Sequence, residues 1–211
     1  MIAGVVCPIA LLVGNLDEAA RCAGLLVDLA HRNAIPYFVG CGRAFTAAVR
    51  MASGNFELAV ADLQEVTTEM QRLKIVLYEA FLNSILAQGL HAAGKLSQAR
   101  SVIDGAIERS EQTHVRWYLP EQWRLKGELL LAQDGPEAVA SGKQWFEKSL
   151  ALARTQGALS WELRTTMSVA RLLAPKKPGE AKELLRAVLA RFSEGFATAD
   201  LIAAAALLES L

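Results

Sequence analysis

A glycine–lysine segment, three histidines and the serines are the residues whose types could support chemistry. The segment from Gly89 to Lys95 has the glycine and lysine spacing of a phosphate-binding P-loop. Leu96 stands where that motif needs a hydroxyl for magnesium, and the preceding residues have a helical pattern, whereas a P-loop follows a strand. We therefore expect no nucleotide site in this segment.

The histidines and serines lack the spacing that metal binding or nucleophilic catalysis requires. His31, His91 and His114 lie far apart, and neither a His-x-x-x-His nor a Cys-x-x-Cys pair occurs. No serine stands in a Gly-x-Ser-x-Gly elbow. The sequence therefore predicts no metal site, no cofactor and no enzyme activity.

Charge and hydropathy exclude two further classes of partner. The 22 basic and 22 acidic residues cancel to zero net charge and are spread evenly, so nucleic acid is not expected as a direct partner. Although 53% of the residues are hydrophobic, no stretch approaches the roughly 20 uncharged residues of a spanning helix. We expect no membrane segment.

The opening run, Met1 to Val13, is apolar and invites comparison with a signal peptide. It has no basic residue before the apolar part, and no small-x-small cleavage site follows it. Cys7, Cys22 and Cys41 are odd in number and lie among apolar neighbours, as reduced core cysteines do. These features predict a cytoplasmic protein.

A repeat with a period of forty organises the chain. The segments Gly14–Ala19, Gly54–Ala59 and Gly94–Ala99 follow one another at this exact interval, twice in succession. After residue 133 the period slips by three residues, and it resumes with Gly142 and Phe146. About five copies fit the sequence.

Each copy has the pattern of a helix, a tight turn and a second helix. Glycine is expected to close the first helix, because a left-handed residue costs it little. Asp17 and Ser97 are placed to cap second helices, and Pro36 and Pro120 stand where first helices should begin. Apolar residues recur at steps of three and four, which predicts an all-α fold.

Small residues recur at matching positions of the copies. Ala47, Ala87 and Gly127 on the first helices, and Ala19, Ala59 and Ala99 on the second, allow two antiparallel helices to approach closely. One helix pair cannot bury both of its apolar faces alone, so the copies are expected to stack as a solenoid.

These positions resemble the tetratricopeptide repeat (TPR). Trp123 and Gly127 match the opening motif of that family, whereas Lys126 and Leu130 depart from it. The period exceeds the usual length of about 34, which fits a longer-helix variant or a HEAT-like array; the regular Gly-x-x-x-x-Ala turn favours the variant. The resemblance implies an all-α, right-handed α-α superhelix of about five TPR-like pairs plus a C-terminal helix, as one domain over residues 1–211.

The second half, over roughly residues 110–211, resembles the C-terminal repeat region of large bacterial STAND-ATPase signalling proteins. The similar segments are Arg116–Glu121, Gly127–Leu130, Trp145–Arg154, Trp161–Arg164 and Phe192–Leu201. In that family a winged-helix DNA-binding domain or a class III adenylate cyclase domain precedes the ATPase, and the repeats end the chain. The resemblance implies a sensor or protein-interaction region whose partners include an upstream ATPase domain.

The tetratricopeptide register places a partner-binding groove on the first helices. The side chains expected to line it, several of them one repeat period apart, are Met51, Phe81, Ser84, Gln88, His91, Glu121, Arg124 and Glu128. Family members that clamp a terminal carboxylate need Lys, Asn and Arg at these slots, and only Arg124 matches. We expect a protein or peptide partner of another kind.

The segment Ile2 to Val13 is apolar on nearly every face, although a terminal repeat normally has a polar outer side. An upstream domain or a second copy of the chain, as in a homodimer, is expected to cover it.

From the missing catalytic motifs and the two resemblances, we expect the function to be non-catalytic binding in a bacterial signalling or transcription regulator. The alternative is a self-association scaffold without an external ligand.

Overall fold

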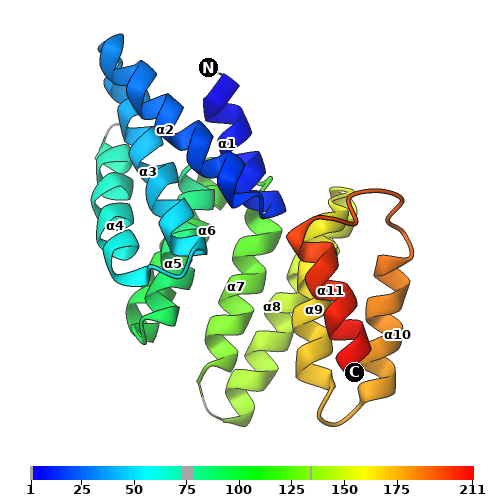
Figure 1. Ribbon diagram of the computed structural model, residues 1–211. Helices are drawn as coiled ribbons and strands as arrows, with labels where there is room; N and C mark the ends of the chain where they lie inside the picture. The colour runs from blue at the N-terminus through cyan, green and yellow to red at the C-terminus, as the bar shows by residue number, and fades with distance from the viewer. Residues whose placement is uncertain (1, 73–77, 134) are drawn as a thin grey trace. The chain divides into compact units, whose positions relative to one another are not determined.

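The computed structural model describes residues 2–72, 78–133 and 135–211, and all regular structure in these ranges is helical. Figure 1 shows the helices in chain order. No helix in these ranges is long and apolar enough to cross a membrane. The helices are α1 (Ile2–Val13), α2 (Leu16–Arg32), α3 (Pro36–Ala52), α4 (Phe56–Arg72), α5 (Glu79–Ala92), α6 (Leu96–Gln112), α7 (Leu119–Leu131), α8 (Pro136–Thr155), α9 (Leu159–Leu173), α10 (Pro178–Leu189) and α11 (Ala199–Ser210).

The helices follow the predicted pairing. Odd-numbered helices α1 to α9 are the first helices of five pairs, even-numbered helices α2 to α10 are the second, and α11 follows the last pair. The predicted all-α repeat fold is confirmed. By its internal contacts the chain divides into two compact units, residues 1–106 and 107–211, which are called unit 1 and unit 2 below. One domain over residues 1–211 stays a prediction.

The turn inside each of the first three pairs has one conformation. Gly14, Gly54 and Gly94 have positive φ angles of 80°, 84° and 74°. The amide after each glycine donates to the carbonyl five residues earlier, at 2.8, 3.0 and 2.8 Å in turn, and the glycine amide donates to the carbonyl three residues earlier. This pattern of hydrogen bonds is the Schellman motif, which ends a helix on a left-handed residue.

The predicted caps differ in part from the observed ones. Asp17 was expected to cap α2, and this prediction is wrong: the side chain of Asn15 accepts the hydrogen bond from the Glu18 amide at 3.1 Å, and Asp17 lies in the first turn. Ser97 likewise lies inside the first turn of α6. Both helices begin two residues earlier than a cap at the polar residue would place them, at Leu16 and Leu96, because the glycine turn takes only two residues.

The small residues lie where helices approach. Ala19, Ala59 and Ala99 are fully buried, and so are Ala47 and Ala87. Helices α7 and α8 are one example. A Cβ atom added at Gly127 would lie 2.6 Å from the Phe146 ring and 3.1 Å from the carbonyl oxygen of Gly142.

The predicted slip of three residues is confirmed in α8. Its buried residues Gly142, Phe146, Ser149 and Ala153 lie one period plus three positions after buried residues of α6. Helix α8 has 20 residues against 17 in α6, and the loop that follows it is correspondingly shorter. As a result α9 begins at Leu159, again one full period after Leu119, where α7 begins.

Pro8 lies inside α1, which runs unbroken from Ile2 to Val13, so it does not delay the start of the helix. Because proline has no amide hydrogen, the carbonyl of Gly4 lacks its usual helical donor. The Tyr78 hydroxyl donates to this oxygen at 3.0 Å. The Tyr78 ring also packs edge-on against Phe45, with centroids 5.1 Å apart. A residue far along the chain thus replaces the missing helical hydrogen bond.

We predict that Tyr78→Phe lowers the free energy of unfolding by about 1–2 kcal/mol, because the Gly4 carbonyl then has no donor. In a Pro8→Ala background residue 8 supplies the missing amide, so the same Tyr78→Phe change should cost clearly less. Urea denaturation of the four proteins of this double-mutant cycle measures the coupling. Equal costs in both backgrounds would show that the hydroxyl has another role.

Candidate interaction site

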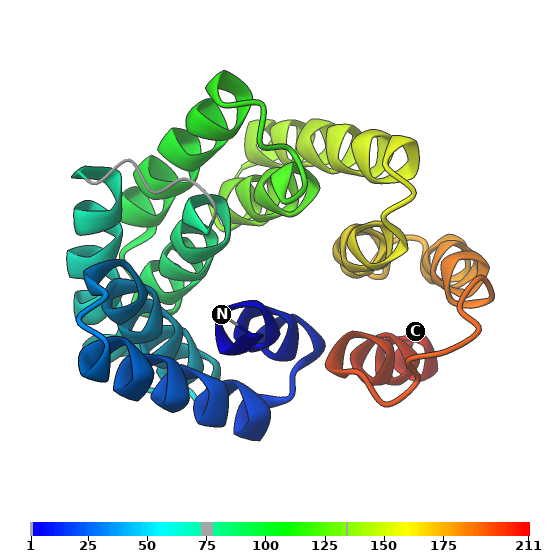
Figure 2. The ribbon, with the colours of Figure 1, turned by 90° about the horizontal axis from the view of Figure 1, so that it is seen from above.

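Three helices of unit 2, α7, α9 and α11, position the largest buried polar network of the described residues. Helix α9 packs against α7, α8, α10 and α11. The view in Figure 2 shows α9 beside both α10 and α11. Side chains on one face of α9 can therefore reach both α7 and α11.

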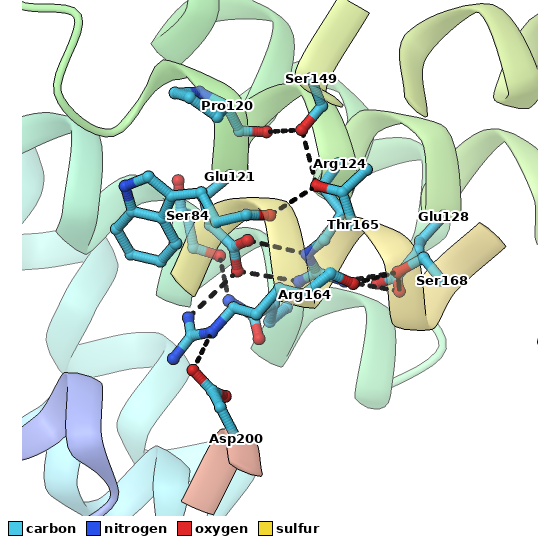
Figure 3. A network of polar contacts seen from close by, with 12 residues as sticks. Ser84, Pro120, Glu121, Arg124, Glu128, Ser149, Arg164, Thr165, Ser168 and Asp200 are labelled. Atoms are coloured by element: carbon cyan, nitrogen blue, oxygen red, sulfur yellow. Dashed lines mark hydrogen bonds and ion pairs between the residues drawn. The ribbon is translucent and has the colours of Figure 1, made fainter. Parts of the chain in front are cut away.

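The centre of this network is an ion pair within α7. The Arg124 guanidinium donates from Nε to Oε2 of Glu121 at 2.7 Å and from Nη2 to Oε1 at 2.8 Å (Figure 3). This two-point geometry matches the planar guanidinium to the carboxylate. The Glu121 side chain is 2% exposed and that of Arg124 is 11% exposed, so both charges are held out of water.

Helices α9 and α11 extend the network in one direction. Nη1 of Arg164 lies 3.4 Å from Oε1 of Glu121, and Nε of Arg164 donates to Oδ2 of Asp200 at 2.7 Å. The Arg164 guanidinium also lies over the Trp161 ring, 5.0 Å from its centroid. One arginine of α9 thus links a carboxylate of α7 to a carboxylate of α11.

In the other direction the network reaches Glu128. Nη1 of Arg124 is 2.5 Å from Oε1 of Glu128 and 3.2 Å from the Ser168 hydroxyl. The Ser168 hydroxyl donates to the same Glu128 oxygen at 2.7 Å. The side chain of Glu128 is 36% exposed, so this end of the network meets solvent.

The pKa of Glu121 follows from these contacts. Burial by itself raises this pKa, but the charge of Arg124 and its hydrogen bonds, helped by Arg164, outweigh burial and lower the pKa to about 2. Burial also acts on Arg124, whose pKa is nevertheless raised, because Glu121 and Glu128 stabilise its charged form. The central pair of Glu121 and Arg124 is therefore ionised near neutral pH.

A second set of polar contacts joins α7, α8 and α9. The Ser149 hydroxyl of α8 donates to the Pro120 carbonyl at 2.7 Å and lies 2.7 Å from the Thr165 hydroxyl. Ser149 and Thr165 are fully buried. These contacts fix the height of α8 and α9 against α7 and hold the charged network in place.

A cavity of about 310 Å³ and one of about 270 Å³ lie in unit 2, and the smaller adjoins the network. Glu128 and Ser168 form its polar side, Leu131 and Phe146 its apolar side, and the exposed Arg171 lies at its rim. The cavity thus offers a carboxylate, a hydroxyl and a guanidinium beside an apolar wall. Such a combination binds a polar group next to an apolar side chain.

The structure divides the eight predicted groove residues by exposure. Glu121, Arg124 and Glu128 come together in unit 2. In unit 1, Met51, Phe81 and Ser84 are buried, with 6%, 2% and 0% exposure, and the Ser84 hydroxyl donates to the Ala80 carbonyl in its own helix. Gln88 and His91 on α5 are exposed.

Sequence reasoning missed the partners from α9 and α11, namely Arg164, Ser168 and Asp200. The repeat period could have indicated two of these three residues. Ser168 lies one period after Glu128, and Arg164 lies one period after Arg124, so each occupies the same repeat slot as a predicted groove residue. Asp200 lies in α11, after the last helix pair, so the repeat pattern does not predict its position.

The described residues contain no group of three His, Cys, Asp or Glu side chains that is placed to hold a metal ion. No protein-family model and no curated protein matches the sequence.

Two solved structures resemble the chain over most of its length. Both are TPR-like repeats of a putative kinesin light chain from Podosopora anserina, one of them a point variant. Their TM-scores are 0.60 and 0.58, with 17% sequence identity, and the alignments cover 89% of this chain and 92% of theirs. The fold is TPR-like. At this identity the TPR-like likeness concerns the fold alone.

The buried ion pair of Glu121 and Arg124 should contribute more to stability than an exposed ion pair of the same spacing. We predict that Glu121→Gln lowers the free energy of unfolding by about 3–5 kcal/mol, because it removes the buried carboxylate that both Arg124 and Arg164 bind. The matched control is Glu69→Gln in the exposed pair of Glu69 and Arg72, which has the same spacing and should cost about 1 kcal/mol or less. Equal losses in urea denaturation would contradict the role assigned to burial.

The loss of stability caused by Glu121→Gln should also depend on pH. Because the folded state lowers the pKa of Glu121 from 4.5 to about 2, its carboxylate stabilises the fold fully above about pH 4.5. This stabilisation is lost as the pH falls from there toward 2. The difference between the native protein and Glu121→Gln should therefore shrink over that interval and stay constant at higher pH.

Proposed function

We propose that the chain is a non-catalytic module that binds a protein or peptide partner on the first helices of its repeat pairs. The observation that supports this most directly is the cavity of about 270 Å³ at the solvent-facing end of the buried network, between α7 and α9. Arrays of helical repeats offer extended binding surfaces, and the TPR-like fold agrees with such a role.

The eight predicted groove residues take two roles in this proposal. Glu128, Gln88 and His91 have exposed side-chain surface and would contact the partner. Met51, Phe81, Ser84, Glu121 and Arg124 are buried and would hold the first helices that carry those contacts. In unit 2 the contact surface would include Arg171 and Ser168, which line the same cavity as Glu128.

The proposed setting is a cytoplasmic bacterial regulator with an upstream ATPase domain, either DNA-binding or cyclase-linked. Its support is the resemblance of residues 110–211 to the repeat region of such proteins. A partner bound at Glu128 would act on the buried network through Arg124, and so shift the packing of α7, α9 and α11. That shift would bias the ATPase domain, provided that the partner binds one packing more tightly than the other.

Self-association is the second candidate, and one observation favours it. Val5, Ile9 and Val13 of α1 are 54%, 54% and 39% exposed and recur every four residues along one helix face. A second copy of the chain would cover this apolar stripe in a scaffold without an external ligand.

Photo-crosslinking separates the two candidates. A photoreactive amino acid in place of Arg171 should give a covalent adduct with a different polypeptide, identified by mass spectrometry after irradiation of cells. The same photoreactive amino acid in place of Glu111, which is exposed on α6 and lines neither cavity of unit 2, is the control and should give no such adduct. Glu128→Gln should reduce the yield of the Arg171-position adduct about fivefold, the effect of one lost hydrogen bond of about 1 kcal/mol.

An adduct of twice the mass of the chain, formed from the photoreactive amino acid in place of Ile9 on the exposed stripe of α1, would instead support self-association. Equal yields of the same adduct from the Arg171 and Glu111 positions would contradict a specific site between α7 and α9.

A further inference from the structure

A second cavity in unit 2, of about 310 Å³, lies among α8, α9 and α10, away from the charged network. Its walls are aliphatic: Leu150 of α8, Val169 of α9, and Leu184 and Val188 of α10. Leu184 is 39% exposed, so the apolar wall opens to solvent. The volume suits one or two side chains of a bound segment.

Three charged side chains close one end of this cavity. Nε of Arg154 donates to Oε1 of Glu162 at 2.8 Å, and Nη1 of Arg191 donates to Oε2 at 2.6 Å. The Glu162 side chain is only 3% exposed, whereas those of Arg154 and Arg191 are 58% and 52% exposed. One buried carboxylate thus anchors two guanidinium groups that face solvent at the cavity.

The charges of this triad do not balance. Burial raises the pKa of Glu162, but the hydrogen bonds and charges of both arginines outweigh it and lower the pKa, so the triad has a net charge of +1. Among the described residues no other acidic side chain pairs with Arg154 or Arg191. Each guanidinium has five N–H donors, and each gives one of them to Glu162.

The network around Glu121 is the internal comparison. There, three carboxylates surround two arginines, whose side chains are only 11% and 19% exposed. In that network each arginine pairs with two carboxylates, so no positive charge is left unmatched. The triad around Glu162 instead presents unmatched positive charge and unused donors beside an aliphatic wall.

We propose that the α8–α10 cavity is a docking site for a partner segment in which an aliphatic side chain stands next to an acidic one. The aliphatic side chain enters between Leu150, Val169 and Leu184. The neighbouring carboxylate of the segment accepts N–H donors from Arg154 and Arg191 and balances the triad. The proposal rests on the proposed function only in taking the partner to be a polypeptide.

The test uses short capped peptides, Ala-Leu-Glu-Ala as the probe and Ala-Leu-Gln-Ala and Ala-Ser-Glu-Ala as controls, titrated into the isotope-labelled chain. The Arg154 and Arg191 Nε–H signals and the Leu184 and Val188 methyl signals report the binding in nuclear magnetic resonance spectra. The probe should bind about tenfold more tightly than each control, since each control lacks either the charge-assisted hydrogen bond or the apolar contact.

Two variants and a matched control locate the site. Ala187→Phe places a ring in the cavity from an exposed lining position, and Arg191→Gln removes one guanidinium; each should weaken probe binding about tenfold. Arg186→Gln makes the same charge change at an exposed position of α10 outside the cavity and should leave binding unchanged. Thermal melts establish whether each variant is folded. If Arg191→Gln does not fold, the binding measured for Ala187→Phe tests the proposal.

Equal affinity for the three peptides, no shift of the two arginine signals, or unchanged binding by Ala187→Phe would overturn the proposal. Hexanoate that binds as tightly as the probe would also overturn it, in favour of a small-acid site. Because the peptide titration needs no natural partner, its outcome is independent of the crosslinking result at the Arg171 position.

Discussion

The buried carboxylate of Glu121 is the constraint on which the arrangement of unit 2 depends. A charge held out of water is costly unless hydrogen bonds and opposite charge surround it. Arg124 meets this requirement from the same helix, and Arg164 meets it from α9 while it also binds Asp200 of α11. The three helices are therefore restricted to the rotation and height at which all these contacts form. The position of Ser168 beside Glu128, and with it the cavity between α7 and α9, follows from that restriction.

Much of the fold was predictable because repeat positions obey local rules. A glycine that ends a helix needs only its own conformation, and the turns at Gly14, Gly54 and Gly94 appear as expected. The buried alanines follow from the need of two helices to approach, which any copy of the repeat shares. The slip of three residues was visible as well, since Gly142 and Phe146 preserve the packing pattern of the previous pair.

The site was less predictable, because its contacts depend on helix rotation and on residues that the repeat does not fix. A small rotation about a helix axis decides whether a residue on the predicted groove face is covered, as Ser84 is, or exposed, as Gln88 is. The period does not say which type of residue fills a slot. Arg164 and Ser168 occupy predicted slots, yet their pairing with Glu121 and Glu128 required the distance between α7 and α9.

One slot shows how function can enter a repeat without changing its fold. Gln122 of α7 and Glu162 of α9 are one repeat period apart, and both are buried. The neutral amide of Gln122 needs no counter-charge, whereas the buried carboxylate of Glu162 does. Arg154 and Arg191 together supply two positive charges against the single negative charge of Glu162. Since the backbone pattern is the same at both positions, the surplus charge at the α8–α10 cavity comes from side-chain identity alone. Departures from the repeat, more than the repeat itself, are therefore where the recognition properties of this chain should be sought.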